Sequence, residues 1–202
     1  MTKPFFALLA LVALAAPVSL GCANAVDSEV VAGETQDLTS ADRELEQELE
    51  AALAGLETGG GEGDPDPYRV FGVALGSDEE MTDEVLLERL LPKLFSDAPV
   101  GDMIPGLEEQ SAAKAWARNV ADPDPADWEG DDEGLELAKE AAAKWRAVKA
   151  IFDAKLMNVK YFDMGYRSAP GGSLETGEVA HVFVGVSATG RIVAISGIDI
   201  WT

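Results

Sequence analysis

The last quarter of the chain carries the pattern that most limits its fold. Two apolar runs, 178–186 and 191–201, lie on either side of Ser187-Ala188-Thr189-Gly190. Runs rich in Val, Ile and aromatic residues around a short turn predict two antiparallel strands joined as a hairpin. Gly190 stands where such a turn commonly needs a positive φ. A further strand is predicted over 158–165, so we expect the C-terminal region to form an antiparallel meander.

Upstream of these strands, apolar residues recur at the spacing of amphipathic helices in four segments. The first begins at the cap-like sequence Thr39-Ser40-Ala41-Asp42 and ends before Gly59. The other three cover 82–95, 107–120 and 132–156. Pro92 is expected to end or kink the second helix, and a strand is predicted over 68–75. Helices packed on an antiparallel sheet define an α+β domain.

Residues 1–21 have the features of a secretory signal. Lys3 supplies a positive charge, and the apolar stretch 5–18 is too short to span a bilayer. Val18-Ser19-Leu20-Gly21-Cys22 resembles a bacterial lipobox, in which Cys22 becomes the lipidated first residue. Ala23-Asn24-Ala25 offers a competing cleavage site, which would release a soluble protein after Ala25. Both alternatives predict an exported protein, either an envelope lipoprotein or a periplasmic or secreted one.

The rest of the chain divides by composition. Residues 22–38 are polar and aperiodic, which indicates a flexible tether after the signal. Residues 39–202 carry the apolar periodicity and are long enough for one globular domain with a real core. We therefore expect a signal over 1–21, a tether over 22–38 and a single domain over 39–202.

The chain has 15 Lys and Arg against 37 Asp and Glu, a formal charge of −22. This balance excludes direct binding of nucleic acid through its phosphates, which needs clustered basic residues. Anionic membranes also repel such a chain, so a lipid anchor is the predicted membrane contact. The acids are concentrated: residues 27–66 carry 13 acids and one base, and residues 122–140 carry nine and one. Residues 158–202 carry four acids and three bases. The charge predicts a cationic partner.

The residues that many enzymes need are scarce. His181 is the one histidine and Cys22 the one cysteine, so neither a Ser-His-Asp nor a Cys-His arrangement is expected. His181 is interpreted as a structural residue of its strand. The acidic run 127–133 lacks the oxygen spacing of an EF-hand and is interpreted as a helix-capping turn. We expect no enzyme and no cofactor; catalysis by a pair of carboxylates is the enzymatic alternative.

An ordered set of features runs through the second half of the chain: an Asp-Trp pair followed by acids, a long helix, an Asn before a strand, and a terminal hairpin. These are Asp127-Trp128-Glu129, the helix through Ala138-Lys139 and Phe152, Asn158-Val159, and the segments 182–184 and 190–196. Together with Pro67-Tyr68-Arg69-Val70-Phe71, this set resembles the nuclease A inhibitors. Members of that family are acidic proteins that block sugar-non-specific DNA/RNA endonucleases of the ββα-metal type.

The resemblance implies an α-β-α sandwich with an antiparallel sheet, similar to the fold of pathogenesis-related protein 1. It also implies a contact surface made by three parts of the chain. Glu62, with Asp64 close behind, would face arginines of the nuclease, and Asp127-Trp128 would lie at the contact. Thr202 matches the terminal Thr of the family's type member and would reach the catalytic Mg²⁺ of the nuclease. Trp201 lies beside Thr202 and stands where the type member has an acid.

The predicted function is therefore a monomeric protein inhibitor of a non-specific, Mg²⁺-dependent endonuclease. A carboxylate-rich surface can replace the charge of a phosphate backbone, and a hydroxyl or carboxylate is a suitable oxygen ligand for Mg²⁺. The alternative is an envelope-anchored binding module whose partner is another basic protein.

Overall fold

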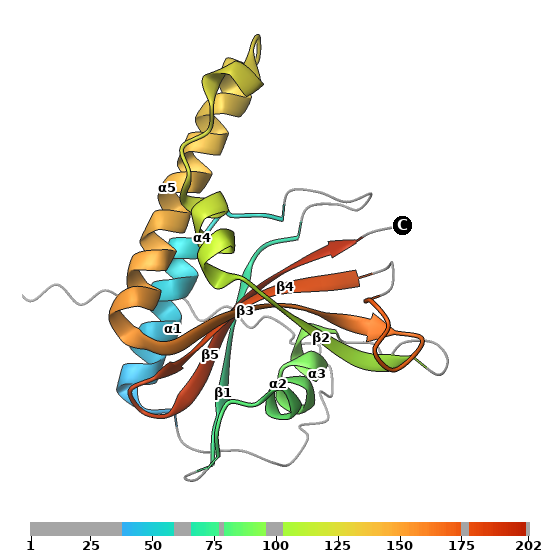
Figure 1. The fold of residues 1–202 in the computed structure, drawn as a ribbon. Coiled ribbons are helices and arrows are strands. Elements are labelled where there is room, and N and C mark those ends of the chain that lie inside the picture. The colour runs from blue at the N-terminus through green and yellow to red at the C-terminus, as the bar shows by residue number, and fades with distance from the viewer. Residues whose placement is uncertain (1–37, 59–65, 77–78, 96–102, 175–177, 201–202) are drawn as a thin grey trace, which may run out of the picture. The chain divides into compact units, whose positions relative to one another are not determined.

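The structure is a computed structural model that describes residues 38–58, 66–76, 79–95, 103–174 and 178–200 (Figure 1). The chain divides into two compact units, Met1–Gly33 and Glu34–Thr202, and all described residues belong to the second. The predicted signal and most of the predicted tether, Cys22 included, lie outside the described residues. No helix within the described ranges is both long enough and apolar enough to cross a membrane.

Eleven helices and strands follow one another within the described ranges. In chain order they are α1 (Ser40–Leu53), β1 (Arg69–Ala74), α2 (Asp83–Arg89), α3 (Leu91–Leu94), β2 (Ile104–Gln110), α4 (Ala112–Val120), the 3-10 helix η1 (Pro125–Trp128), α5 (Asp132–Lys155), β3 (Leu156–Arg167), β4 (Glu178–Ser187) and β5 (Arg191–Ile200). The predicted α+β class is confirmed.

The described strands form one antiparallel sheet in the order β1-β5-β4-β3-β2. The predicted meander of β3, β4 and β5 is confirmed and occupies its centre. The hairpin turn is also confirmed: Gly190 has φ +81°, and its N–H donates to the carbonyl of Ser187 at 2.9 Å. The sheet is open, because β1 and β2 lie at opposite edges and do not pair with each other.

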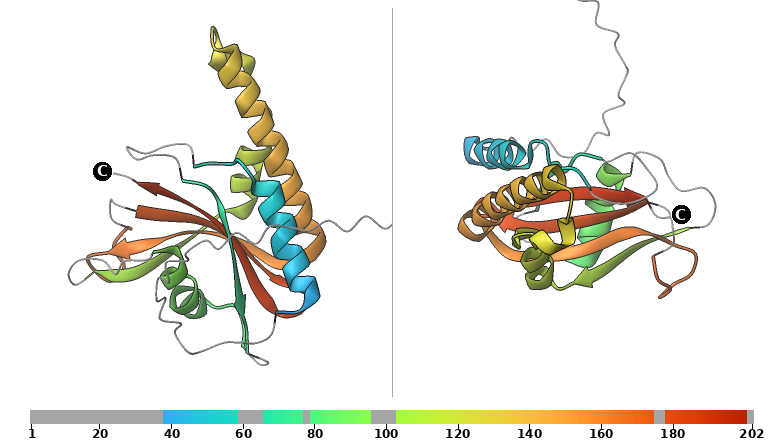
Figure 2. Two further views of the ribbon diagram at one scale, coloured as in Figure 1. Left: turned by 180° about the vertical axis from the view of Figure 1, so that it is seen from behind. Right: turned by 90° about the horizontal axis from the view of Figure 1, so that it is seen from above.

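Helices α1, α4 and α5 pack on one face of the sheet (Figure 2). At the centre of this packing, Trp116 of α4 stacks on Phe183 of β4, with ring centroids 3.9 Å apart. Trp145 and Phe152 of α5 flank the pair. These aromatic side chains bury large apolar areas and provide the main hydrophobic contribution to this layer.

Helices α2 and α3 pack on the opposite face. Side chains alternate along a strand, so Val182 and Val184 point away from Phe183 and into this second core. Leu86 and Leu90 from the helical side are 1% and 0% exposed. Each face of the central strands is therefore buried beneath helices.

Three predicted helices differ from those observed. The first was expected to continue up to Gly59 but ends at Leu53, after which Gly55 has φ +72° and Glu57 forms a bridge with Pro67.

The segment 107–120 contains a helix only from Ala112, because residues 104–110 form the edge strand β2, which pairs with β3. Pro105 is tolerated there because an edge strand leaves one row of backbone groups unpaired. The segment 82–95 is divided into α2 and α3, and Pro92 lies in the first turn of α3, as a residue without an N–H can.

Candidate functional site

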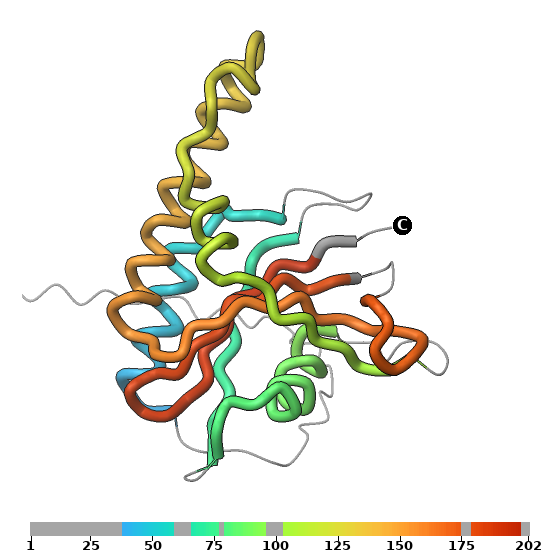
Figure 3. Tube along the Cα trace, in the orientation of Figure 1, coloured from blue at the N-terminus to red at the C-terminus, as the bar shows by residue number. Residues whose placement is uncertain are grey.

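The N-terminal half of α5 extends beyond the sheet, and the chain between α4 and α5 runs alongside it (Figures 1 and 3). We call residues 121–140 the acidic arm. Both the predicted contact pair Asp127-Trp128 and the acidic segment recognised in the sequence lie in it. Of the predicted contact residues, Asp127 and Trp128 are those within the described ranges.

Local hydrogen bonds shape the tip of the arm. Pro123 and Pro125 favour extended backbone at the residues before them. The Asp124 carboxylate accepts from the Ala126 N–H at 2.9 Å and begins the single turn of η1. The Asp131 carboxylate accepts from the Gly134 N–H at 2.9 Å and caps α5. The acidic run is a helix-capping turn, as predicted from its sequence.

Trp128 lies at the end of η1 and packs against the first turn of α5. Its Cζ3 atom is placed so that a Cβ on Gly134 would lie 2.7 Å away, closer than real contacts allow. Gly134 therefore makes room for the indole ring. The ring is half-buried against the arm, and the Asp127 side chain beside it is exposed. A half-exposed Trp can anchor a protein interface.

The arm is strongly negative. All nine of its acids are exposed, and one Lys lies among them. Three of these acids form ion pairs: Asp122 with Arg146, Glu136 with Lys139, and Glu140 with Lys144. The other six make no ion pair with any described residue; they are Asp124, Asp127, Glu129, Asp131, Asp132 and Glu133. The surplus of negative charge faces solvent.

Asp132, Glu136 and Glu140 follow one another at four-residue intervals along α5. Residues with this spacing lie on one face of a helix, about 6 Å apart along its axis. Glu136 and Glu140 of this row pair with Lys139 and Lys144, whereas Asp132 and the exposed Asp127 and Glu129 at the tip form no ion pair with any described residue. Exposed carboxylates of this kind attract a cationic surface.

The other predicted contact residues, Glu62, Asp64, Trp201 and Thr202, lie outside the described residues. The described residues that precede and follow 59–65 are held together by a bridge between Glu57 and Pro67. The Thr58 N–H also donates to the Asp66 carbonyl at 2.9 Å. Both attachment points of the Glu62 loop are therefore fixed on the domain.

These attachment points lie against the last strand. A Cβ on Gly197 of β5 would collide with Thr58 and would lie 2.6 Å from the Tyr68 ring. Gly197 is three residues before the end of the described part of β5 at Ile200. The segment with Glu62 and Asp64 and the segment with Trp201 and Thr202 thus start from neighbouring points of the domain.

Trp128 lies nearer the N-terminus of α5 than the starting points of the Glu62 and Thr202 segments do. The Tyr68 ring packs edge-on against Trp145 at 4.9 Å, which places the start of β1 beside the middle of α5. Gly134, under Trp128, is eleven residues nearer the N-terminus of that helix. At 1.5 Å per residue this corresponds to about 16 Å along the axis. A protein interface of ordinary size, about 800 Å² per partner, spans such a separation.

His181 has a partner that the sequence did not reveal. Its Nδ1 lies 2.6 Å from a carboxylate oxygen of Asp163 on the neighbouring strand. The two residues face each other in the register of β3 and β4, and this register is set by tertiary pairing rather than by local sequence. Among the described residues, no group of three or more His, Cys, Asp or Glu side chains is placed to hold a metal ion.

The chain matches no protein-family model and no curated protein sequence.

Proposed function

We propose that this protein inhibits a sugar-non-specific, Mg²⁺-dependent DNA/RNA endonuclease by covering its active site. The observation that carries the proposal is the acidic arm, with nine exposed acids against one base and the half-exposed Trp128 at its tip. The ordered resemblance to the nuclease A inhibitors provides the target class. The finer architecture, an α-β-α sandwich similar to pathogenesis-related protein 1, belongs to the same proposal.

Charge mimicry is the physical basis of the inhibition. A nuclease that cleaves any DNA or RNA recognises the phosphate backbone, which is common to all sequences. Its substrate groove is therefore cationic. An exposed row of carboxylates on a folded arm competes for that groove and increases the rate of encounter through long-range attraction. The arm offers no phosphodiester bond to cleave.

Three contacts complete the proposed complex. Glu62 and Asp64 pair with nuclease arginines, Asp127-Trp128 anchors the rim of the interface, and Thr202, next to Trp201, supplies an oxygen ligand to the nuclease Mg²⁺. The common origin of the Glu62 and Thr202 segments beside Gly197 supports their acting together. The inhibitor needs no cofactor of its own, acts as a monomer and catalyses no reaction.

The export signal predicted over residues 1–21 favours a target outside the cytoplasm. A lipidated Cys22 would hold the inhibitor at the bacterial envelope, whereas cleavage after Ala25 would release it. In both cases the nuclease would be met in the envelope or as it arrives from outside. Intact mass of the mature protein distinguishes the two, because lipidation adds a diacylglycerol group to Cys22.

The direct test measures cleavage of DNA and RNA by a panel of ββα-metal endonucleases in the presence of the full chain. We expect inhibition that weakens as salt is added, because the attraction between charged surfaces is screened. Glu62→Ala and removal of Thr202 should each reduce inhibition. The double variant Asp127→Asn/Glu129→Gln should weaken it several-fold by removing two exposed charges from the arm tip.

The matched control for the arm is Glu80→Gln/Glu88→Gln. It removes the same number of charges from exposed positions in the α2 region, away from the arm. This variant should inhibit like the unaltered chain. If no nuclease of the panel is slowed at high protein concentration, the inhibitor proposal fails. Capture of a basic protein that is not a nuclease from envelope extract would then support the alternative, an envelope-anchored binding module.

A further inference from the structure

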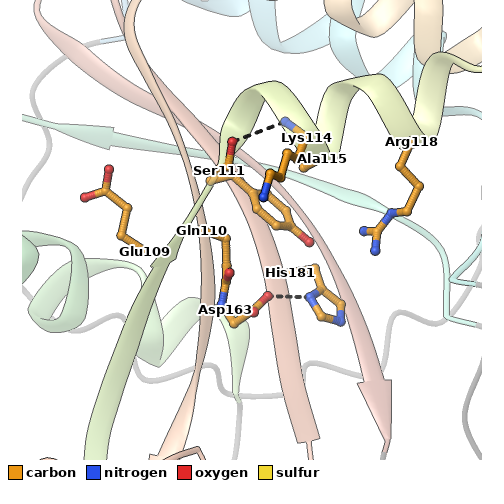
Figure 4. Close-up of a pocket in the computed structure, with 9 residues that line it drawn as sticks. Glu109, Gln110, Ser111, Lys114, Ala115, Arg118, Asp163 and His181 are labelled. Atoms are coloured by element: carbon orange, nitrogen blue, oxygen red, sulfur yellow. Dashed lines mark hydrogen bonds and ion pairs between the residues drawn. The ribbon is translucent and has the colours of Figure 1, made fainter.

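A second surface feature, distinct from the acidic arm, lies along helix α4. A cavity of about 460 Å³ opens there between α4 and the strands β2, β3 and β4 (Figure 4). We call it the α4 pocket. The side chains that line it and enter the argument are Glu109, Ser111, Lys114, Arg118, Asp163 and His181.

The position of the pocket follows from the sheet. On this face, β3 and β4 pair Tyr161 with Phe183, and then Asp163 with His181 two residues farther along. Phe183 lies under Trp116 of α4. Asp163 and His181 are not covered by this ring, and their side chains are about one-quarter exposed. The side chains on this face of the sheet thus change from aromatic to polar at the position where α4 no longer packs on them. That change forms the polar floor of the pocket.

Both acids of the lining already have partners. Glu109 pairs with Lys160 at 3.1 Å, and a carboxylate oxygen of Asp163 lies 2.6 Å from Nδ1 of His181. Lys114 and Arg118 line the same pocket, yet neither forms an ion pair with any described residue. Two cations that form no ion pair with any described residue therefore meet at one cavity of a chain whose formal charge is −22.

Helix α4 directs both cations to the same place. Lys114 and Arg118 are separated by four residues and therefore lie on one face of the helix, and Figure 4 shows both side chains on the pocket side. Ser111 caps the helix and accepts from the Lys114 N–H at 3.3 Å.

We propose that the α4 pocket binds a small phosphate monoester, with its phosphate between Lys114 and Arg118 and its organic part over the floor beside His181. A doubly charged phosphate matches two cations that have no ion-pair partner within the described ranges. The cavity is larger than inorganic phosphate requires and falls within the range of small-molecule sites. This binding is independent of nuclease inhibition.

The test is an NMR titration of the isotopically labelled full chain at constant ionic strength. Inorganic phosphate, adenosine 5′-monophosphate and adenosine are the three probes. We expect saturable shifts of the amide signals of 111–118 and of His181 with both phosphates, tighter binding of the monoester, and no shift with adenosine. Equal binding of inorganic phosphate and monoester would assign the site to free phosphate and overturn the monoester class.

Lys114→Gln/Arg118→Gln removes the two cations. It should weaken monoester binding at least about tenfold, because a charge-assisted contact contributes roughly that factor. Arg43→Gln/Lys93→Gln is the control, since it removes one Arg and one Lys from exposed positions outside the pocket. The control should bind like the unaltered chain. Absence of saturable binding, or an equal loss in both double variants, would refute the site.

Discussion

The carboxylate of Asp42, in the first turn of α1, accepts a hydrogen bond from the hydroxyl of Thr189, with 2.6 Å between the oxygen atoms. The same side chain completes a capping box with Thr39 and is also approached by the Ser187 hydroxyl at 3.4 Å. Asp42 is 4% exposed. One buried carboxylate thus caps the first helix and attaches it to the hairpin turn that lies 147 residues later.

Asp42→Ala is expected to lower the free energy of unfolding by about 3 kcal/mol. The change removes a cap interaction and leaves the buried Ser187 hydroxyl and the Thr189 hydroxyl without their charged acceptor. Urea denaturation measures the effect. Glu44→Ala, on an exposed position of the same helix, is the control and should change stability by less than about 0.5 kcal/mol. Equal effects of the two substitutions would contradict the role of Asp42.

The same contact predicts a dependence on pH. Burial by itself raises the pKa of Asp42, but hydrogen bonds from Thr189 and Thr39 and the charge of Arg191 outweigh it, so the pKa lies below its ordinary value of 3.8. A carboxyl group with a lowered pKa stabilises the fold fully above its unfolded pKa. This contribution is lost as the pH falls through the lower, folded pKa.

Urea denaturation of the unaltered chain and of Asp42→Asn at a series of pH values tests this dependence. The difference in stability between them should be constant near neutral pH and should shrink below the ordinary pKa of Asp. A difference that grew in acid would show that the folded state raises this pKa, contrary to the contacts observed.

Gly197→Ala is expected to affect stability and inhibition together. An added Cβ would collide with Thr58 and lie 2.6 Å from the ring of Tyr68, so the attachment of the Glu62 loop must shift. Overpacking of this kind costs about 1–3 kcal/mol. Because the Thr202 segment continues from the same strand, nuclease inhibition should fall more than the stability loss alone explains.

The control for this variant is Gly76→Ala. A Cβ there meets Glu79 at 3.5 Å, which is an ordinary contact. Its unfolding free energy and its inhibition should both stay close to those of the unaltered chain. If Gly197→Ala behaved in the same way, the close approach of Thr58 and Tyr68 to β5 would not hold in solution.

Trp128→Ala should separate binding from folding. The indole ring packs on the arm and belongs to neither of the two cores, so unfolding should change by less than about 1 kcal/mol. An interface anchor, however, costs about 2 kcal/mol or more in binding, which is about 30-fold in the inhibition constant. Inhibition equal to that of the unaltered chain would remove Trp128 from the contact.

Gly134→Ala tests the packing of the Trp128 ring against the first turn of α5. Ala favours a helix over Gly by about 1 kcal/mol, but its Cβ would collide with the Asp131 carboxylate and would lie 2.7 Å from the indole ring. Both side chains must therefore move, and the movement of the ring should shift its indole N–H signal in NMR spectra and reduce inhibition. An unchanged indole signal would show that Trp128 does not rest on Gly134.

Local sequence was sufficient for the elements that depend on near neighbours. The capping box at Thr39 and Asp42 involves residues three positions apart, and the turn at Gly190 depends on one glycine. The long helix α5 was predicted as 132–156 and observed as Asp132–Lys155, because its apolar side chains repeat over more than six turns. Each of these patterns is contained within a short window of the chain.

Edge strand β2 shows where local patterns fail. Its residues Glu108, Glu109 and Gln110 favour a helix in isolation, and the sequence predicted one. In the folded protein they pair with β3 about fifty residues later, and the hydrogen bonds of that pairing override the weak local preference. Pairing between distant segments leaves no signal within either of them.

By itself, the sequence determined the α+β class, the central meander, the capping of α1 and α5, and the concentration of acids that forms the arm. Only the tertiary structure decided that Asp42 meets Thr189, that Asp163 meets His181, and that Lys114 and Arg118, which pair with no acid among the described residues, share a pocket. The reason is physical: helix periodicity and turn chemistry act over a few residues, whereas strand register and the meeting of side chains depend on how distant segments pack.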